Sequence, residues 1–155
     1  MISKTIVTVF GLGLSPKAPG TAGSLGAVLL WILAHYLWAT PNTSYALIGA
    51  AFILSVIFVP LYLKHTKKKD PKEVVIDEAL GQWIALIGAG TNPLLILLAF
   101  LLFRFFDILK PWPICKIDAL GGSQLKNTIS VIFDDVVAGL CASGIILFIL
   151  KNFIG

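Results

Sequence analysis

Apolar residues fill most of the chain in long runs that short polar loops separate. Two runs, 21–39 and 45–63, are each long enough to cross the hydrocarbon core of a bilayer as a helix of about 20 residues. A third and a fourth apolar segment flank a break at 90–93, and a fifth covers 129–150. This pattern predicts an all-α integral membrane bundle of about five helices.

Prolines set the expected ends of the third and fourth helices. The pair Asp70-Pro71 has the order of an N-cap residue followed by a proline in the first turn, so the third helix is expected to run from Pro71 to about Gly90. Asn92-Pro93 predicts the start of the fourth helix in the same way. That helix is expected to stop near Lys110, because prolines follow.

Composition agrees with a membrane protein. Hydrophobic residues make up 57% of the 155 residues and charged residues only 13%, whereas about a quarter of the residues in a soluble domain are charged. Because there are too few polar side chains to cover a soluble core, we expect a single membrane-embedded domain over 1–155. Cys115 and Cys141 lack the spacing of a zinc or redox motif.

Lysines predict the orientation of the chain in the membrane. They precede the first apolar run, follow the second and lie between the fourth and fifth, whereas the loops 40–44 and 91–92 carry no charge. By the positive-inside rule, the N-terminus and the lysine-bearing loops are expected in the cytoplasm and the C-terminus outside. This bias also explains the net charge of +4, so nucleic acid is not an expected partner.

Acidic residues gather at the expected cytoplasmic ends of the helices. Asp77 and Glu78 lie about two turns into the third helix, Asp107 lies near the end of the fourth, and Asp134 and Asp135 lie several residues inside the fifth. Two adjacent acids within an apolar run are costly unless a cation compensates them. Mg²⁺ does so with a few carboxylates and keeps water and phosphate oxygens as its other ligands. The pattern therefore favours a metal site over ordinary surface ion pairs.

Adjacent residues of a helix point about 100° apart, so the last two acids cannot both face the same neighbour. Asp135 shares its stripe with Gly139 and Ser143, the small residues expected where membrane helices touch. We therefore expect Asp135 in the interior of the bundle, with Asp134 nearby.

A segment rich in small residues, 11–24, forms a turn before the first long helix. It matches neither a dinucleotide fingerprint nor a P-loop. Free backbone N–H groups near Thr21 and Ser24, with Lys17 close by, make it a candidate phosphate cradle. A helix cap built for tight packing is an equally good interpretation of the segment alone.

The chain lacks the patterns of covalent phosphatase mechanisms. No arginine stands six residues after either cysteine, neither histidine is placed as a nucleophile, and there is no Asp-x-Asp pair. With these covalent mechanisms excluded, attack by a metal-activated water molecule is the remaining mechanism.

Four segments in this order resemble the phosphatidylglycerophosphatase A family. They are 14–24 (LSPKAPGTAGS), 70–83 (DPKEVVIDEALGQW), 103–113 (FRFFDILKPWP) and 134–139 (DDVVAG). The resemblance spans nearly the whole chain, although 114–128 contributes little to it. It implies a magnesium-dependent enzyme of the bacterial inner membrane that hydrolyses phosphatidylglycerophosphate, a phospholipid, to phosphatidylglycerol and inorganic phosphate. The family motifs fall on Asp77, Glu78, Gln82, Arg104, Asp107, Lys110, Asp134 and Asp135.

The predicted site follows from these residues. Mg²⁺ is expected on some subset of Glu78, Asp107, Asp134 and Asp135, with Asp77 as a further ligand or general base. The expected substrate-binding residues are Lys17, Thr21, Ser24, Gln82, Arg104 and Lys110. Two other classes of function stay open at this point. One is a small cation or proton transporter, because carboxylates in membrane helices also mark ion paths. The other is a noncatalytic lipid-binding subunit.

Overall fold

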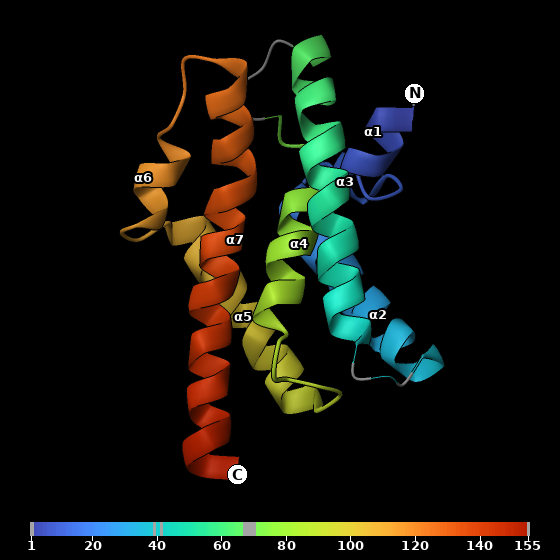
Figure 1. Ribbon diagram of the computed structural model, residues 1–155, viewed down its shortest axis with the longest axis vertical. Coiled ribbons are helices and arrows are strands. Elements are labelled where there is room, and N and C mark those ends of the chain that lie inside the picture. The colour runs from blue at the N-terminus through green and yellow to red at the C-terminus, as the bar shows by residue number, and fades with distance from the viewer. Residues whose placement is uncertain (1, 39, 41, 67–70, 155) are drawn as a thin grey trace.

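The computed structural model describes residues 2–38, 40, 42–66 and 71–154. Over these residues the protein is built from seven α-helices, and the described chain contains no strand (Figure 1). The helices are α1 (Ile2–Val7), α2 (Pro19–Leu37), α3 (Thr43–Thr66), α4 (Ile76–Ala85), α5 (Pro93–Leu109), α6 (Ile114–Asp118) and α7 (Gln124–Ile149). The all-α prediction is confirmed. The five expected helices correspond to α2, α3, α4, α5 and α7, and the sequence pattern missed the short α1 and α6.

Three helices among the described residues are long and apolar enough to cross a membrane. They are α2, α3 and α7, the last counted to Asn152, with mean hydropathy of 1.4, 2.4 and 2.1. Their large apolar side chains are widely exposed on the outside of the bundle, as Leu29 and Leu140 illustrate. A surface of this kind is suited to lipid rather than to water.

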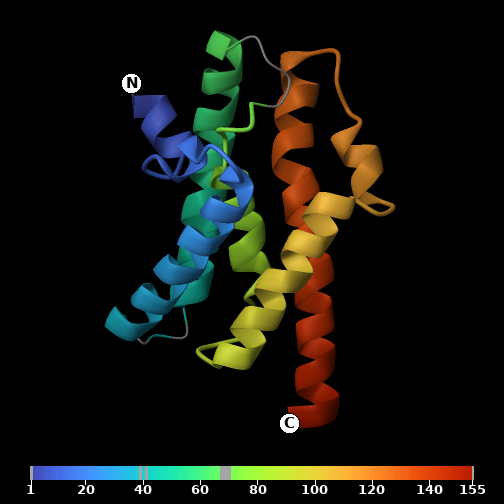
Figure 2. The ribbon, with the colours of Figure 1, turned by 180° about the vertical axis from the view of Figure 1, so that it is seen from behind.

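The long helices alternate in direction. Figures 1 and 2 both show the N-terminus, the end of α3 and the start of α7 at one end of the bundle, and the C-terminus at the other. The end of α2, the start of α3 and the turn between α4 and α5 lie toward the end that holds the C-terminus.

Helix α4 lies at the centre of the bundle, where it packs against α2, α3, α5 and α7. All of its residues are buried except Glu78, which is partly buried. The contact with α7 is close because glycines face each other: a Cβ atom on Gly139 would overlap the carbonyl oxygen of Gly81. Ser143 is also buried on this face of α7. The small-residue contact expected along the stripe of Asp135 is therefore observed.

The predicted limits of the third helix, 71–90, were wrong. Asp70 lies outside the described residues, and α4 begins only at Ile76 and ends at Ala85. The start is displaced because the N–H group of Val75 donates to the carbonyl oxygen of Val7, 2.8 Å away, which ties this segment to the N-terminal helix. With ten residues, α4 is about 15 Å long, too short to cross a bilayer by itself.

The predicted limits of the fourth helix are confirmed. The side chain of Asn92 caps α5 by accepting hydrogen bonds from the N–H groups of Leu94 and Leu95. The helix ends at Leu109, and Lys110 follows in the left-handed region with φ of 43°.

Candidate active site

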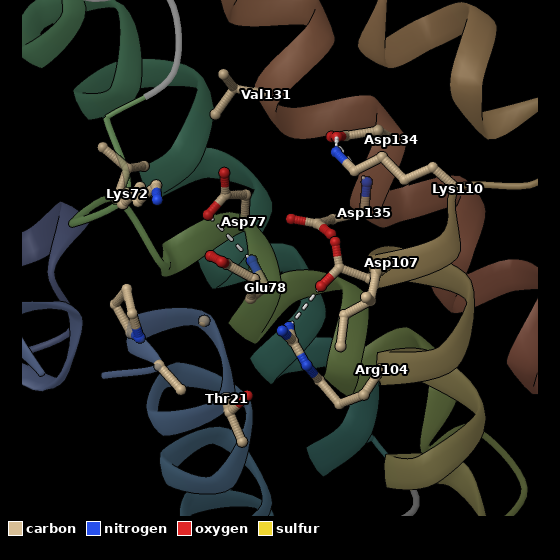
Figure 3. Close-up of a pocket in the computed structure, with 15 residues that line it drawn as sticks. Thr21, Lys72, Asp77, Glu78, Arg104, Asp107, Lys110, Val131, Asp134 and Asp135 are labelled. Carbon is tan, nitrogen blue, oxygen red and sulfur yellow. Dashed lines mark hydrogen bonds and ion pairs between the residues drawn. The ribbon is translucent and has the colours of Figure 1, made fainter. Parts of the chain in front are cut away.

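A cavity of about 380 Å³ opens where the first turns of α2 and α4 approach the end of α5 and the middle of α7 (Figure 3). Its charged lining residues are Lys72, Asp77, Glu78, Arg104, Asp107, Lys110, Asp134 and Asp135. The remaining lining residues are Ala18, Pro19, Gly20, Thr21, Val74, Ile108 and Val131. The structure thus brings all five acids predicted from the sequence into one cavity.

Three of these acids form a compact cluster. Carboxylate oxygens of Asp77, Glu78 and Asp135 all lie within 4.8 Å of one another. Asp77 and Asp135 are 5% and 4% exposed, so water contributes little to stabilising their charges. The cluster forms because the contact between Gly81 and Gly139 brings α4 and α7 close together, one turn beyond these acids.

The cluster offers oxygen atoms that the protein leaves unused. Within the described part of the chain, Glu78 Oε2 and Asp135 Oδ1 are buried without a hydrogen-bond partner. Burial raises the pKa of Glu78 well above its usual range, and the nearby carboxylates of Asp135 and Asp107 raise it further. Buried carboxylates in this arrangement need a cation, and a set of oxygen donors alone suits a hard divalent ion such as Mg²⁺. The residues present therefore fit the metal that the sequence predicts.

Asp107 belongs to the same cavity but has a cationic partner within the protein. Arg104 Nη1 donates to Asp107 Oδ2 at 2.5 Å, one helical turn away on α5. Figure 3 shows Asp107 beside Asp135, with Arg104 below both in this view. The start of α2 reaches this group only because residue 20 is glycine: a Cβ atom there would lie 2.5 Å from Glu78 Oε1.

Asp134 is compensated by a different cation. Lys110 Nζ lies 2.5 Å from Asp134 Oδ2 and 2.7 Å from Asp118 Oδ1. Burial lowers the pKa of Lys110, but its hydrogen bonds with these two acids raise it more, so the net shift is upward and the ammonium group stays charged. Asp134 thus lines the cavity as one half of an ion pair and lies outside the three-carboxylate cluster.

Comparison with known proteins shows to which family the chain belongs. The family model for phosphatidylglycerophosphatase A matches residues 5–150. The chain belongs to the phosphatidylglycerophosphatase A family. The resemblance seen in the four sequence segments is therefore confirmed, and with it the prediction of a phosphatase.

Curated relatives of this family member cover most of its length. It is 37% identical over 146 residues to phosphatidylglycerophosphatase A of Escherichia coli, with 90% of this chain and 78% of the relative covered. It is 36% identical over 136 residues to phosphatidylglycerophosphatase A of Haemophilus influenzae, covering 86% and 79%. A protein of Bacteroides thetaiotaomicron named putative phosphatidylinositol-3-phosphatase is 37% identical over 142 residues, covering 87% and 85%. No solved structure matches the chain.

The predicted substrate-binding residues of this phosphatase divide into two groups. Thr21, Arg104 and Lys110 line the cavity. Ser24 and Gln82 are fully buried and do not line it. The hydroxyl group of Ser24 donates a hydrogen bond of 2.9 Å to the carbonyl oxygen of Gly20 and accepts a long one of 3.4 Å from Arg104 Nη1, so its observed contacts lie within the protein.

Two lysines depart from the sequence-based expectation. Lys17 does not line the acidic cavity but lines a neighbouring one. Lys72, which the sequence suggested only as a marker of orientation, lines both cavities. Its place within the segment 70–83, five residues before Asp77, was the available signal.

Proposed function

We propose that this phosphatase hydrolyses the phosphomonoester of phosphatidylglycerophosphate, releasing phosphatidylglycerol and inorganic phosphate, and that it requires Mg²⁺. The observation that carries the proposal is the cluster of Asp77, Glu78 and Asp135, with oxygens within 4.8 Å of one another in a cavity that also holds an arginine and two lysines. The names of the relatives from Escherichia coli and Haemophilus influenzae support this choice of substrate.

Glu78 and Asp135 are the proposed metal ligands, because each has a buried oxygen that no group of the described chain uses. Asp77 completes the cluster as a further ligand or as the base that accepts a proton from the attacking water. Mg²⁺, when bound there, supplies positive charge to the phosphate and activates a water molecule. Asp107 and Asp134 are partly satisfied by Arg104 and Lys110, and we assign them to positioning those cations.

Positive groups that line the same cavity would bind the phosphate. Arg104 and Lys72 line the cavity, and the first turn of α2 presents the backbone N–H groups of Gly20 and Thr21 beside them. A phosphate dianion placed there would meet cations and the positive end of a helix dipole, which offset the repulsion by the acids. Water attacks the phosphorus, the bond from phosphorus to the glycerol oxygen breaks, and that oxygen takes up a proton.

The position of the cavity supports a lipid substrate at the surface of a membrane. It opens near the end of the bundle where α3 ends and α7 begins, the end that carries Lys4, Lys64 and Lys126. By the positive-inside rule we propose that this end faces the cytoplasm of a bacterium and that the helices lie in its inner membrane. Reporter fusions at the two termini test this: a cytoplasmic C-terminus would contradict it.

Phosphate release from phosphatidylglycerophosphate by the purified protein tests the proposed function. We expect activity in Mg²⁺, loss of essentially all activity in excess EDTA, and recovery when Mg²⁺ is restored. Full turnover in excess chelator would contradict the metal requirement. No turnover in Mg²⁺ would contradict the substrate.

A second lipid belongs in the same assay. The Bacteroides thetaiotaomicron relative is as similar to this chain as the Escherichia coli relative, at 37% identity, but it is named putative phosphatidylinositol-3-phosphatase. Comparing kcat/KM for phosphatidylinositol 3-phosphate and for phosphatidylglycerophosphate decides between the two substrates. We expect kcat/KM to be larger for phosphatidylglycerophosphate.

A further inference from the structure

A second cavity of about 430 Å³ adjoins the active-site cavity. It is lined by Lys4, Gly13, Leu14, Ser15, Pro16, Lys17, Pro19, Lys72 and Glu73. Pro19 and Lys72 line both cavities, so the two spaces share a wall formed by the start of α2 and the segment before α4. A ligand with two separated anionic groups could therefore occupy both.

The charge of this second cavity is opposite to that of the first. Three lysines line it against one acid, whereas the active-site cavity has five carboxylates and three cations. Within the described part of the chain, Lys4, Lys17 and Lys72 form no ion pair, so their charges are available to a ligand. The one acid, Glu73, accepts a hydrogen bond of 3.1 Å from the hydroxyl group of Tyr62.

The walls of the cavity are held together by contacts between segments that lie far apart in the sequence. Gly13 packs so closely on the backbone of Glu73 that a Cβ atom would overlap its carbonyl oxygen. The hydrogen bond from Val75 to Val7 joins the same two segments. The lysines are therefore displayed on a packed frame rather than on independent loops.

Apolar side chains beside the lysines point to a lipid ligand. Leu14 lines the cavity and is 56% exposed. Leu12 and Phe10, just before it, are also exposed. Exposed apolar residues next to a cationic cavity match a ligand whose anionic group is attached to acyl chains.

We infer that this lysine cavity, defined by Lys4, Lys17 and Lys72, binds the phosphodiester group of the lipid substrate while its phosphomonoester occupies the acidic cavity. The inference rests on the proposed function, because phosphatidylglycerophosphate carries both groups, separated by one glycerol unit. The lysine cavity then selects lipids with a second phosphate, and Lys17 acts on the substrate at a distance from the reacting phosphorus.

A double variant, Lys4→Met with Lys17→Met, tests the inference, because methionine keeps much of the apolar stem and removes the charge. Kinetics are measured in mixed micelles of neutral detergent with Mg²⁺. We expect KM for phosphatidylglycerophosphate to rise about tenfold and kcat to change less than about twofold, since neither lysine reaches the reacting group. The matched control is Lys64→Met with Lys126→Met, two exposed lysines outside both cavities, and it should leave KM unchanged.

A substrate without the second phosphate separates this cavity from general attraction to anionic lipid. Phosphatidate carries a phosphomonoester only, so its KM should be the same for the double variant and the wild type. An equal rise in KM for both lipids would overturn the inference in favour of nonspecific attraction. Where phosphatidate turnover is too slow to measure, inhibition by phosphatidylglycerol, which keeps the phosphodiester, should weaken about tenfold in the double variant.

The outcomes distinguish this inference from the proposed function. Wild-type protein without activity on phosphatidylglycerophosphate contradicts the proposed function. Wild-type activity with an unchanged KM in the double variant overturns the lysine cavity alone.

Discussion

Asp134 and Asp135 are neighbours on α7, are almost equally buried and line the same cavity, yet their charges are compensated in different ways. Asp134 lies 2.5 Å from the ammonium group of Lys110. Asp135 instead faces α4, where it lies with Asp77 and Glu78. Adjacent residues of a helix point about 100° apart, and this offset gives the two acids different surroundings. Asp134 meets a cation of the protein, whereas Asp135 meets two other carboxylates.

Burial alone therefore does not identify a metal ligand. A buried carboxylate with a lysine partner is already compensated, whereas a group of buried carboxylates is stable only if something positive joins it. We therefore propose that the cluster around Asp135 binds the metal and that the pair of Asp134 and Lys110 organises the cavity wall.

Removing only the charge of Asp135 should have the largest effect. Asp135→Asn keeps the size of the side chain but loses a proposed ligand, and we expect turnover to fall at least about a hundredfold at saturating lipid. Steady-state phosphate release measures this, and circular dichroism in detergent checks that the variant folds. Wild-type turnover would exclude Asp135 as a ligand.

Disturbing the contact between Gly81 and Gly139 should have the second largest effect. In Gly139→Ala the new methyl group meets the backbone of Gly81, so α7 must move away from α4. We expect about a tenfold loss of turnover and a lower midpoint of thermal unfolding, because overpacking costs about 1–3 kcal/mol and displaces Asp135 from Glu78. Gly144→Ala is the matched control, since a Cβ atom there meets no heavy atom within 4 Å. Equal behaviour of the two alanine variants would mean that this contact does not position the site.

Asp134→Asn should affect stability more than chemistry. It leaves Lys110 with Asp118 as its remaining carboxylate partner, and we expect a loss of about 1–3 kcal/mol in unfolding free energy with only about a threefold to fivefold fall in turnover. Thermal unfolding in detergent and phosphate release measure the two effects separately. A fall in turnover as large as that of Asp135→Asn would make Asp134 a member of the metal site.

Asp118→Asn should have the smallest effect. The side chain of Asp118 is 44% exposed, and Lys110 keeps its shorter contact with Asp134, so turnover should stay within about twofold of wild type. Phosphate release assayed beside the Asp134 variant measures this. A larger loss would show that α6 takes part in holding the cavity.

Much of the arrangement could be predicted from local signals. Asn92 and Pro93 marked the start of α5 because capping and proline geometry depend on a few adjacent residues. The stripe of Asp135 and Gly139 placed one acid in the interior because helical periodicity holds along α7. In each case the physical cause lies within one or two turns of chain.

The predictions that failed depend on contacts between distant segments. Pro71 did not begin a helix, because Val75 forms its hydrogen bond with Val7, and no local pattern records that pairing. Lys17 was expected to bind the substrate phosphate together with Arg104 and Lys110, but it lines the neighbouring cavity, and Lys72, which had no expected role in the site, lines both. Only the packing of the N-terminal segment on the chain before α4 decides which lysine lines which cavity.

Direct measurement of Mg²⁺ binding tests whether the cluster of three carboxylates holds the metal. Titration calorimetry on chelator-treated protein in neutral detergent compares the wild type with Asp135→Asn and Asp134→Asn. We expect that the wild type binds Mg²⁺, that Asp135→Asn weakens binding at least about tenfold, and that the affinity of Asp134→Asn stays within about threefold of wild type. Equal weakening by both substitutions, or no binding by the wild type, would contradict the assignment of the metal to the cluster of Asp77, Glu78 and Asp135.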